Sequence, residues 1–301
     1  MDEVSRVGDV TAQLGECPVW HPGEQLLYWE DIDGKALHRT NPATEQTETR
    51  ELPGRPGSFA FTETPGRLML ATETTLEWFD WQSGHLDHFV EVEDPARGNR
   101  LNDGRCDHAG RFIVGTMHPD SSRRDFDGSL YSISPDGQVD TLENGVGIPN
   151  STAFDADRGR MYWADTLRST IWQWDYDGET GRRSNKSVFF DYSEHPDVAG
   201  LPDGACLDAE GCLWSASVTG WTLTRLTPDG KVDRRIELPV SMPTMPAFGG
   251  SDLSTIFVTS LAGGPVDSER SRGVPAGALL AVDVAVCGLP ESIFGASGGT
   301  L

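Results

Sequence analysis

Four polar residues occupy the same position in a repeated sequence unit, where their side chains could bind a metal ion. They lie 9 or 10 residues before a turn that recurs along the chain: Glu16, Asn102, Asn150 and Asp203. Turn chemistry alone accounts for Asn150 in IPNST and Asp203 in LPDGA, since Asn and Asp favour turns. It does not account for Glu16 in LGECPVW or for the shared position. We therefore expect Glu16, Asn150 and Asp203 to form a metal site.

The donor atoms of this trio favour a hard divalent cation. Two carboxylates and a carboxamide offer only oxygen ligands, which Ca²⁺, Mg²⁺ and Mn²⁺ prefer. Zn²⁺ and Fe²⁺ remain open alternatives. The seven His residues are scattered, and none forms a pair with ligand spacing. We expect one divalent ion from this group as the cofactor.

A second group of polar residues should reach the same site. The repeat places the loop 118–120 beside the segment 100–103, because one antiparallel strand ends where its neighbour begins. Arg100, close to Asn102, is a ready hydrogen-bond donor to the hydroxyl or carbonyl oxygens of a sugar. His118 is a second candidate contact for a substrate, although a lone loop histidine is more often incidental.

The elements that position these residues come from six copies of one unit. The copies are anchored at Leu26, Arg67, Arg111, Arg160, Cys212 and Thr255. Successive anchors are 41, 44, 49, 52 and 43 residues apart, so the units account for nearly the whole chain. Each unit contains a Gly-containing turn, an apolar strand, an alternating strand such as SLYSI or TIWQW, and a more polar outer strand.

Four short strands per unit, repeated six times, are typical of a β-propeller. We predict an all-β fold, a six-bladed β-propeller with four-stranded antiparallel blades, forming a single domain over residues 1–301. The N-terminal segment 4–13 should add a strand to the last blade and so close the ring. Residues at one position of the repeat then face the central channel at equal height.

Charge and composition exclude several classes of protein. The net charge of −23, from 24 basic and 47 acidic residues, argues against a nucleic-acid partner and favours a neutral substrate over a phosphate. The N-terminus lacks the pattern of a signal peptide, and no stretch is apolar enough to span a membrane. Five scattered Cys residues without a CxxC motif are typical of reduced thiols. We expect a cytoplasmic protein, monomeric or a weak homo-oligomer.

At these residues the sequence resembles the family of regucalcin (senescence marker protein), gluconolactonases and related sugar lactonases. The resemblance is carried by LGECPVWHPGEQLLYWEDIDG, NRLNDGRCDHAGRFIVGTM, GIPNSTAFDADRGRMYWADT and LPDGACLDAEGCLWSAS. It implies a six-bladed propeller with one divalent metal held by Glu16, Asn150 and Asp203.

The resemblance also extends the site. It implies substrate contacts from Arg100 and Asn102, with Asp103 lining the site, and it matches an acidic substrate-binding residue to Asp120. The GTMH and FGGxDLxTxFVT segments are most similar to bacterial pentonolactonases.

The function implied is metal-dependent hydrolysis of a sugar aldonolactone to the aldonic acid, in bacterial sugar catabolism. The metal acts as a Lewis acid on the lactone, and Asp203 is the candidate general base for the attacking water. Two alternatives stay open, a non-catalytic, calcium-binding regucalcin-like protein and a propeller esterase of the paraoxonase type. A receptor-type propeller, suggested by the YWED and YWAD segments, predicts secretion and disulfides, which this sequence does not favour.

Overall fold

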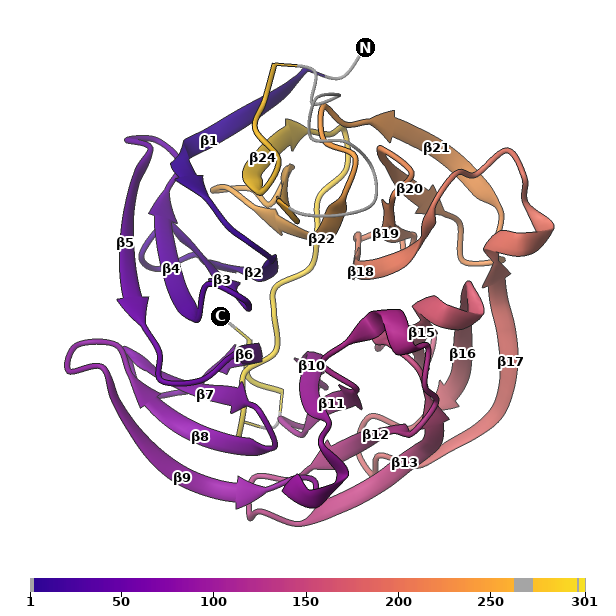
Figure 1. The fold of residues 1–301 in the computed structure, drawn as a ribbon. Helices are drawn as coiled ribbons and strands as arrows, with labels where there is room; N and C mark the ends of the chain where they lie inside the picture. The colour runs from indigo at the N-terminus through magenta and orange to yellow at the C-terminus, as the bar shows by residue number, and fades with distance from the viewer. Residues whose placement is uncertain (1–2, 263–272, 297, 301) are drawn as a thin grey trace.

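The computed structural model describes residues 3–262, 273–296 and 298–300. It contains six four-stranded antiparallel sheets, arranged in a ring around a central axis (Figure 1). Helical structure in the described part of the chain is limited to short 3₁₀ turns. The prediction of a six-bladed, four-stranded β-propeller is confirmed.

Each of the first five blades uses four consecutive strands, ordered from the axis outward. Blade 1 contains β2 Gly15–His21, β3 Leu26–Asp31, β4 Ala36–Asn41 and β5 Gln46–Glu51. Blade 2 contains β6 Pro56–Phe61, β7 Arg67–Thr72, β8 Thr75–Asp80 and β9 His85–Glu91. Blade 3 contains β10 Arg100–Cys106, β11 Phe112–Met117, β12 Gly128–Ile133 and β13 Val139–Val146.

The remaining strands follow the same plan. Blade 4 contains β14 Pro149–Asp155, β15 Arg160–Asp165, β16 Thr170–Tyr176 and β17 Arg183–Asp191. Blade 5 contains β18 Leu201–Leu207, β19 Leu213–Val218, β20 Thr222–Leu226 and β21 Val232–Glu237. Blade 6 contains β22 Pro243–Gly249, β23 Thr255–Ser260, β24 Ala278–Asp283 and β1 Val4–Thr11. The 3₁₀ turns are η1 Pro95–Arg97, η2 Ser121–Arg123, η3 Thr166–Arg168 and η4 Tyr192–Glu194.

The ring is closed by joining both ends of the chain in one sheet. β1 pairs with β24 in antiparallel register, with Val4 opposite Val282. The outermost strand of blade 6 is therefore the first strand of the sequence, as predicted for the segment 4–13. This closure holds the last blade against the first and covers the edge of β24.

The core lies between neighbouring blades, and the second strands contribute to every one of its layers. The continuous apolar pattern of these strands reflects burial on both faces. Trp29 of β3, Trp163 of β15 and Trp214 of β19 are fully buried and pack in three of the interblade layers. Rigid packing of large aromatic side chains between blades fixes the spacing of the inner strands.

Every inner strand is irregular near its beginning. In all six blades the register between the first and second strands shifts within three residues of the repeated position, for example between Glu16 and Val19 and between Asn150 and Ala153. Cys17 and Ser151, which directly follow two of the predicted ligands, have positive φ values of 44° and 57°. Such irregularities redirect side chains and are frequent next to active sites.

The C-terminal segment closes the end of the channel opposite to these irregularities. It crosses the middle of the ring, drawn in yellow in Figure 1. Its backbone hydrogen-bonds to residues at the far ends of several inner strands, with Phe294 N–H donating to Phe61 O and Gly298 N–H to His108 O. Glu291 forms an ion pair of 2.9 Å with Arg105 near the end of β10. The C-terminal segment thus covers the end of the channel where the inner strands finish.

Candidate metal and substrate site

The beginnings of the inner strands bring the predicted ligands together at one height of the channel. Asn150 of β14 donates from Nδ2 to Asp203 Oδ1 of β18 at 2.6 Å. The same nitrogen donates to Thr166 Oγ1 at 2.9 Å. Glu16 of β2 makes no direct hydrogen bond to either residue, but it lies close enough for the Asp203 charge to act on its carboxyl group. Three blades therefore contribute to one polar cluster.

Asn102 extends this cluster to blade 3. Its Nδ2 donates to Pro149 O at 2.9 Å and to Asn150 Oδ1 at 3.2 Å. Arg100 in turn donates from one guanidinium nitrogen to Asn102 Oδ1 at 2.7 Å and to Leu101 O at 2.9 Å. The result is a continuous hydrogen-bonded chain that runs around the channel from Arg100 to Asp203.

Asp103 lies against the same cluster from the side of blade 3. Its Oδ2 accepts a hydrogen bond of 2.9 Å from the backbone N–H of Thr152 in blade 4. Its Oδ1 is buried and has no hydrogen-bond partner among the described residues. Asp103 therefore links the inner strands β10 and β14, while its Oδ1 lacks a hydrogen-bond donor among the described residues.

The electrostatics of the cluster favour a bound cation. Burial raises the pKa of Glu16 well above its usual value, and the charges of Asp203 and Asp103 raise it further. Burial also raises the pKa of Asp203, with an added contribution from Asp103. Like charges held together away from water are costly unless a positive charge compensates them. A divalent cation fits this acidic, oxygen-only set of donors.

The proposed ligand set is uncommon because one of its three members is an asparagine. In the described part of the chain, no three His, Cys, Asp or Glu side chains are arranged to hold a metal ion. Glu16, Asn150 and Asp203 form a different kind of set, with two carboxylates and one carboxamide. Because Asn150 points its amide nitrogen at Asp203, its oxygen faces a shared cation only after a half-turn of the carboxamide.

The structure places His118 and Asp120 on an exposed loop, outside this hydrogen-bonded chain. Asp120 accepts from the backbone N–H of Ser122 at 3.1 Å and caps the 3₁₀ turn η2. His118 accepts from the backbone N–H of Asp120 at 3.0 Å and contacts Arg123. The loop follows β11, next to the beginning of β10. Substrate contacts by these two residues stay predictions.

Other acidic residues at the same end of the blades hold the backbone in place. Asp31 accepts from the backbone N–H groups of Gln13 and Leu14 at 2.8 and 2.9 Å. Asp165 does the same for Gly147 and Ile148 at 2.9 and 3.0 Å. Asp31 and Asp165 thus fix the backbone just before the inner strand of their own blade, Asp31 before Glu16 and Asp165 before Asn150.

Sequence reasoning did not find Glu30, Thr166 or Arg105. Glu30 of β3 is fully buried beside Glu16 and has no hydrogen-bond partner among the described residues. Thr166 accepts from Asn150 and donates to Pro202 O at 2.7 Å. A glutamate inside the apolar strand LLYWED is the one signal in the sequence that points to a buried carboxylate.

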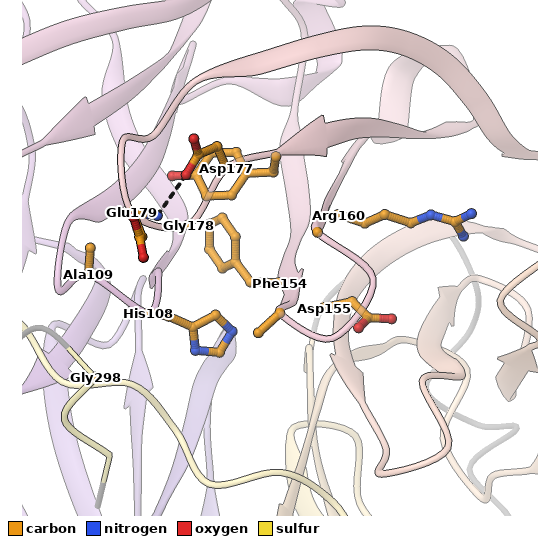
Figure 2. A pocket seen from close by; sticks show the side chains of 12 residues that line it. His108, Ala109, Phe154, Asp155, Arg160, Asp177, Gly178, Glu179 and Gly298 are labelled. Atoms are coloured by element: carbon orange, nitrogen blue, oxygen red, sulfur yellow. Dashed lines mark hydrogen bonds between the residues drawn. The ribbon is translucent and has the colours of Figure 1, made fainter.

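A separate cavity lies at the other end of blades 3 and 4. It has a volume of about 350 Å³ and is lined by turns that follow β10, β14 and β16. Figure 2 shows His108 and Phe154 close together at this cavity, with Asp177 and Glu179 from the β16–β17 turn. These residues lie at or just beyond the ends of β10, β14 and β16, so the cavity is distinct from the cluster around Asp203.

Fold and site together define a six-bladed propeller with an acidic, oxygen-lined cluster at the end of the channel where the inner strands begin. Residues 14–262 match the SMP-30/gluconolactonase/LRE-like family model. The chain belongs to this family, as its sequence motifs predicted.

Named relatives extend over almost the full chain. Pentonolactonase XacC of Haloferax volcanii is 38% identical over 96% of this chain and 97% of its own length. The 6-deoxy-6-sulfogluconolactonase of Pseudomonas putida is 35% identical over 93% of this chain and 94% of its own. Among solved structures, the calcium-binding protein regucalcin from Agrobacterium tumefaciens has a TM-score of 0.88 and 29% identity, covering 96% of each chain.

Two further features bear on the class of protein. The five cysteines are all free thiols, and only Cys287 is exposed. Within the described residues there is no helix of the length and apolar character needed to cross a bilayer.

Proposed function

We propose that this protein is a lactonase that hydrolyses a sugar aldonolactone to its aldonic acid and requires one divalent cation. The names of two relatives that align with almost the whole chain, a pentonolactonase and a sulfogluconolactonase, support this class of carboxylic ester hydrolase. A neutral lactone also suits an acidic protein better than an anionic substrate. The proposed role is in sugar breakdown in the cytoplasm.

One observation carries the proposal, namely the convergence of Glu16, Asn150 and Asp203 at one end of the channel. The three residues come from three blades and share a buried, acidic environment. We assign them as the ligands of the cation. When bound there, the cation supplies Lewis acidity toward the lactone carbonyl.

The other roles follow from the positions of the side chains. Asp203 is partly exposed to the channel, and we assign it as the general base that takes a proton from the attacking water. Arg100 and Asn102 are already connected by a hydrogen bond, which preorganises their remaining polar atoms to bind sugar hydroxyls. Asp103 lines the site, and we assign Asp120 and His118 as candidate contacts at its rim.

A second candidate function is cation binding without catalysis. The resemblance to a calcium-binding regucalcin structure, with a TM-score of 0.88, favours it over other non-enzymatic roles. It uses the same trio of ligands and therefore differs from our proposal in a single respect, the turnover of a lactone.

The test is hydrolysis of a panel of pentono- and hexonolactones by purified protein, before and after treatment with a chelator. We expect turnover of at least one aldonolactone above its spontaneous rate, loss of that turnover with chelator, and recovery with one added divalent ion. Cation binding without turnover of any lactone in the panel supports the second candidate instead. Full activity in both Glu16→Gln and Asp203→Asn variants contradicts the assigned site.

A further inference from the structure

Glu30 is a buried carboxylate that the site described so far does not use. Its exposed fraction is 0%. Both of its carboxylate oxygens are buried and have no hydrogen-bond partner among the described residues. No ion pair of Glu30 is present in that part of the chain either. A buried carboxylate is rarely tolerated without a hydrogen bond, a counter-charge or a metal ion.

The position of Glu30 relates it directly to the cation site. In the antiparallel pair β2–β3, Glu30 is the residue opposite Glu16. Side chains directly opposite one another lie on the same face of a sheet, with their Cβ atoms about 4.5–5.5 Å apart. Glu30 therefore stands one strand behind a proposed ligand, farther from the channel axis.

The protein supplies little compensating charge at this place. Arg100 is the positive group whose charge acts most strongly on Glu30, but it is not within ion-pair distance among the described contacts. Its hydrogen bonds go to Leu101 O and Asn102 Oδ1, and its Nε is buried without a partner. Meanwhile Asp103 adds a further negative charge near Glu30. The protein itself therefore compensates a negative charge on Glu30 only in part.

We propose that Glu30 is a positioning residue of the cation site, whose negative charge behind Glu16 strengthens the binding of the divalent ion. This inference rests on the proposed function, because it requires a cation between Glu16, Asn150 and Asp203. Glu30 acts through Glu16 and through the field at the ion, and it makes no direct contact with the lactone. Its burial without partners destabilises the cation-free protein, and the bound ion offsets that cost.

A matched comparison is available within the chain. Glu93 is also a buried glutamate, with an exposed fraction of 4%, but its carboxylate is fully used. It accepts hydrogen bonds from Thr116 Oγ1, Asn99 Nδ2 and Tyr131 Oη at 2.6, 2.7 and 2.9 Å. Removing the charge of Glu93 breaks good interactions, whereas removing the charge of Glu30 breaks none that the structure shows.

The experiment is calorimetric titration of chelator-treated protein with Ca²⁺ and, separately, with Mn²⁺. The proteins compared are the wild type, Glu30→Gln, Glu30→Met and Glu93→Gln, each also melted without cation. We expect both Glu30 variants to bind the ions about tenfold more weakly or worse, as is usual when a residue behind a metal ligand is changed. We also expect the cation-free Glu30 variants to melt at or above the wild-type temperature. Glu93→Gln should melt lower, with an unchanged dissociation constant.

The outcomes separate this inference from the proposed function. If the wild type binds neither ion, both the proposed metal site and the role of Glu30 are wrong. If the wild type binds and the Glu30 variants bind equally tightly, only the role of Glu30 is wrong. If the Glu30 variants raise the KM for the lactone but leave the cation affinity unchanged, the proposed role of Glu30 is also wrong. Glu30 then acts on Arg100 and not on the ion.

Discussion

At the scale of single residues, the site depends on side chains that already hold one another before any ligand arrives. Asp203 is the member of the trio most open to the channel, and Asn150 holds one of its oxygens at 2.6 Å. Asn150 also donates from Nδ2 to Thr166 Oγ1 and accepts at Oδ1 from Asn102 Nδ2, so it is held from two further sides. The half-turn that aims the Asn150 oxygen at a cation would replace its hydrogen bond to Asp203 with a shared ion, and Asp203 would still be held in one direction for accepting a proton from water.

Replacing Asp203 with asparagine should therefore abolish most of the activity without unfolding the protein. We expect kcat to fall by about 10²–10⁴-fold, the usual contribution of a positioned general base. The melting temperature without cation should not fall, because the variant removes one of several clustered negative charges. Steady-state kinetics with the best lactone of the panel and a thermal melt check both expectations.

A matched control is Asp136→Asn, which changes an exposed turn residue bonded to Ser134. It should retain wild-type kcat. A kcat for Asp203→Asn within a factor of about three of the wild type would remove Asp203 from the general-base role.

At the scale of elements, the inner strands and their irregular beginnings aim the side chains. Gly57 of β6 lies at the repeated position in blade 2, 10 residues before the anchor Arg67. A Cβ atom at Gly57 would lie 2.5 Å from Leu101 O and 3.1 Å from the backbone nitrogen of Asn102. Because Gly57 has no side chain, β10, which carries Arg100 and Asn102, can lie close to β6.

Gly57→Ala should consequently weaken both stability and substrate binding. The methyl group must push the backbone of β10 away, which we expect to cost about 1–3 kcal/mol in the free energy of unfolding. The displacement of Arg100 and Asn102 should raise KM more than it lowers kcat. Denaturant unfolding and Michaelis–Menten kinetics measure the two effects.

The control for this change is Gly178→Ala, where an added Cβ meets no atom within 4 Å. We expect its stability to stay within about 0.5 kcal/mol of the wild type, as for most surface substitutions. Equal effects of the two substitutions would show that the close approach at Gly57 does not matter.

The sequence could predict the elements because each blade repeats one pattern. The anchors gave the number of blades, and a common offset from them placed Glu16, Asn150 and Asp203 in one layer. A local sequence pattern cannot show which residues of neighbouring strands and blades a strand packs against. Glu30 was missed for this reason, since its burial depends on the packing of β3 against its neighbours. The Glu291–Arg105 pair was missed as well, because it joins residues 186 positions apart.

Backbone conformation is the other feature that could not be predicted from the sequence. Cys17 and Ser151 adopt positive φ, although neither residue type favours it. Both residues also contact the inner strand of the neighbouring blade, with Ser151 Oγ donating to Asp203 O and Cys17 Sγ to Phe59 O. A sequence pattern with period two shows that a strand is present but not where its register shifts.

At the scale of the whole molecule, a closed ring keeps residues from different blades at fixed distances. The site draws on blades 1, 3, 4 and 5, so any opening of the ring alters its geometry. The first strand of the chain closes the last blade by pairing with β24, from Val4↔Val282 to Thr11↔Ala278.

Deleting residues 1–11 should therefore open the ring and impair the site, although no site residue is removed. The loss exposes the edge of β24 and leaves blade 6 with three strands. We expect the melting temperature to fall by about 10 °C or more, since a chain of this size loses roughly 2–4 °C per kcal/mol. Thermal unfolding and size-exclusion chromatography report the change. A deletion of residues 1–3, which precedes β1, should have no such effect; similar losses in both would contradict the role of the closure.

The central claim is that Glu16, Asn150 and Asp203 bind one divalent cation at the end of the channel where the inner strands begin. Crystals grown with Mn²⁺, measured above and below the Mn absorption edge, test it most directly. We predict one strong anomalous peak per chain, within ligand distance of oxygen atoms of all three residues and absent in an Asp203→Asn crystal. A peak at another place, or none in the channel at saturating Mn²⁺, would contradict it.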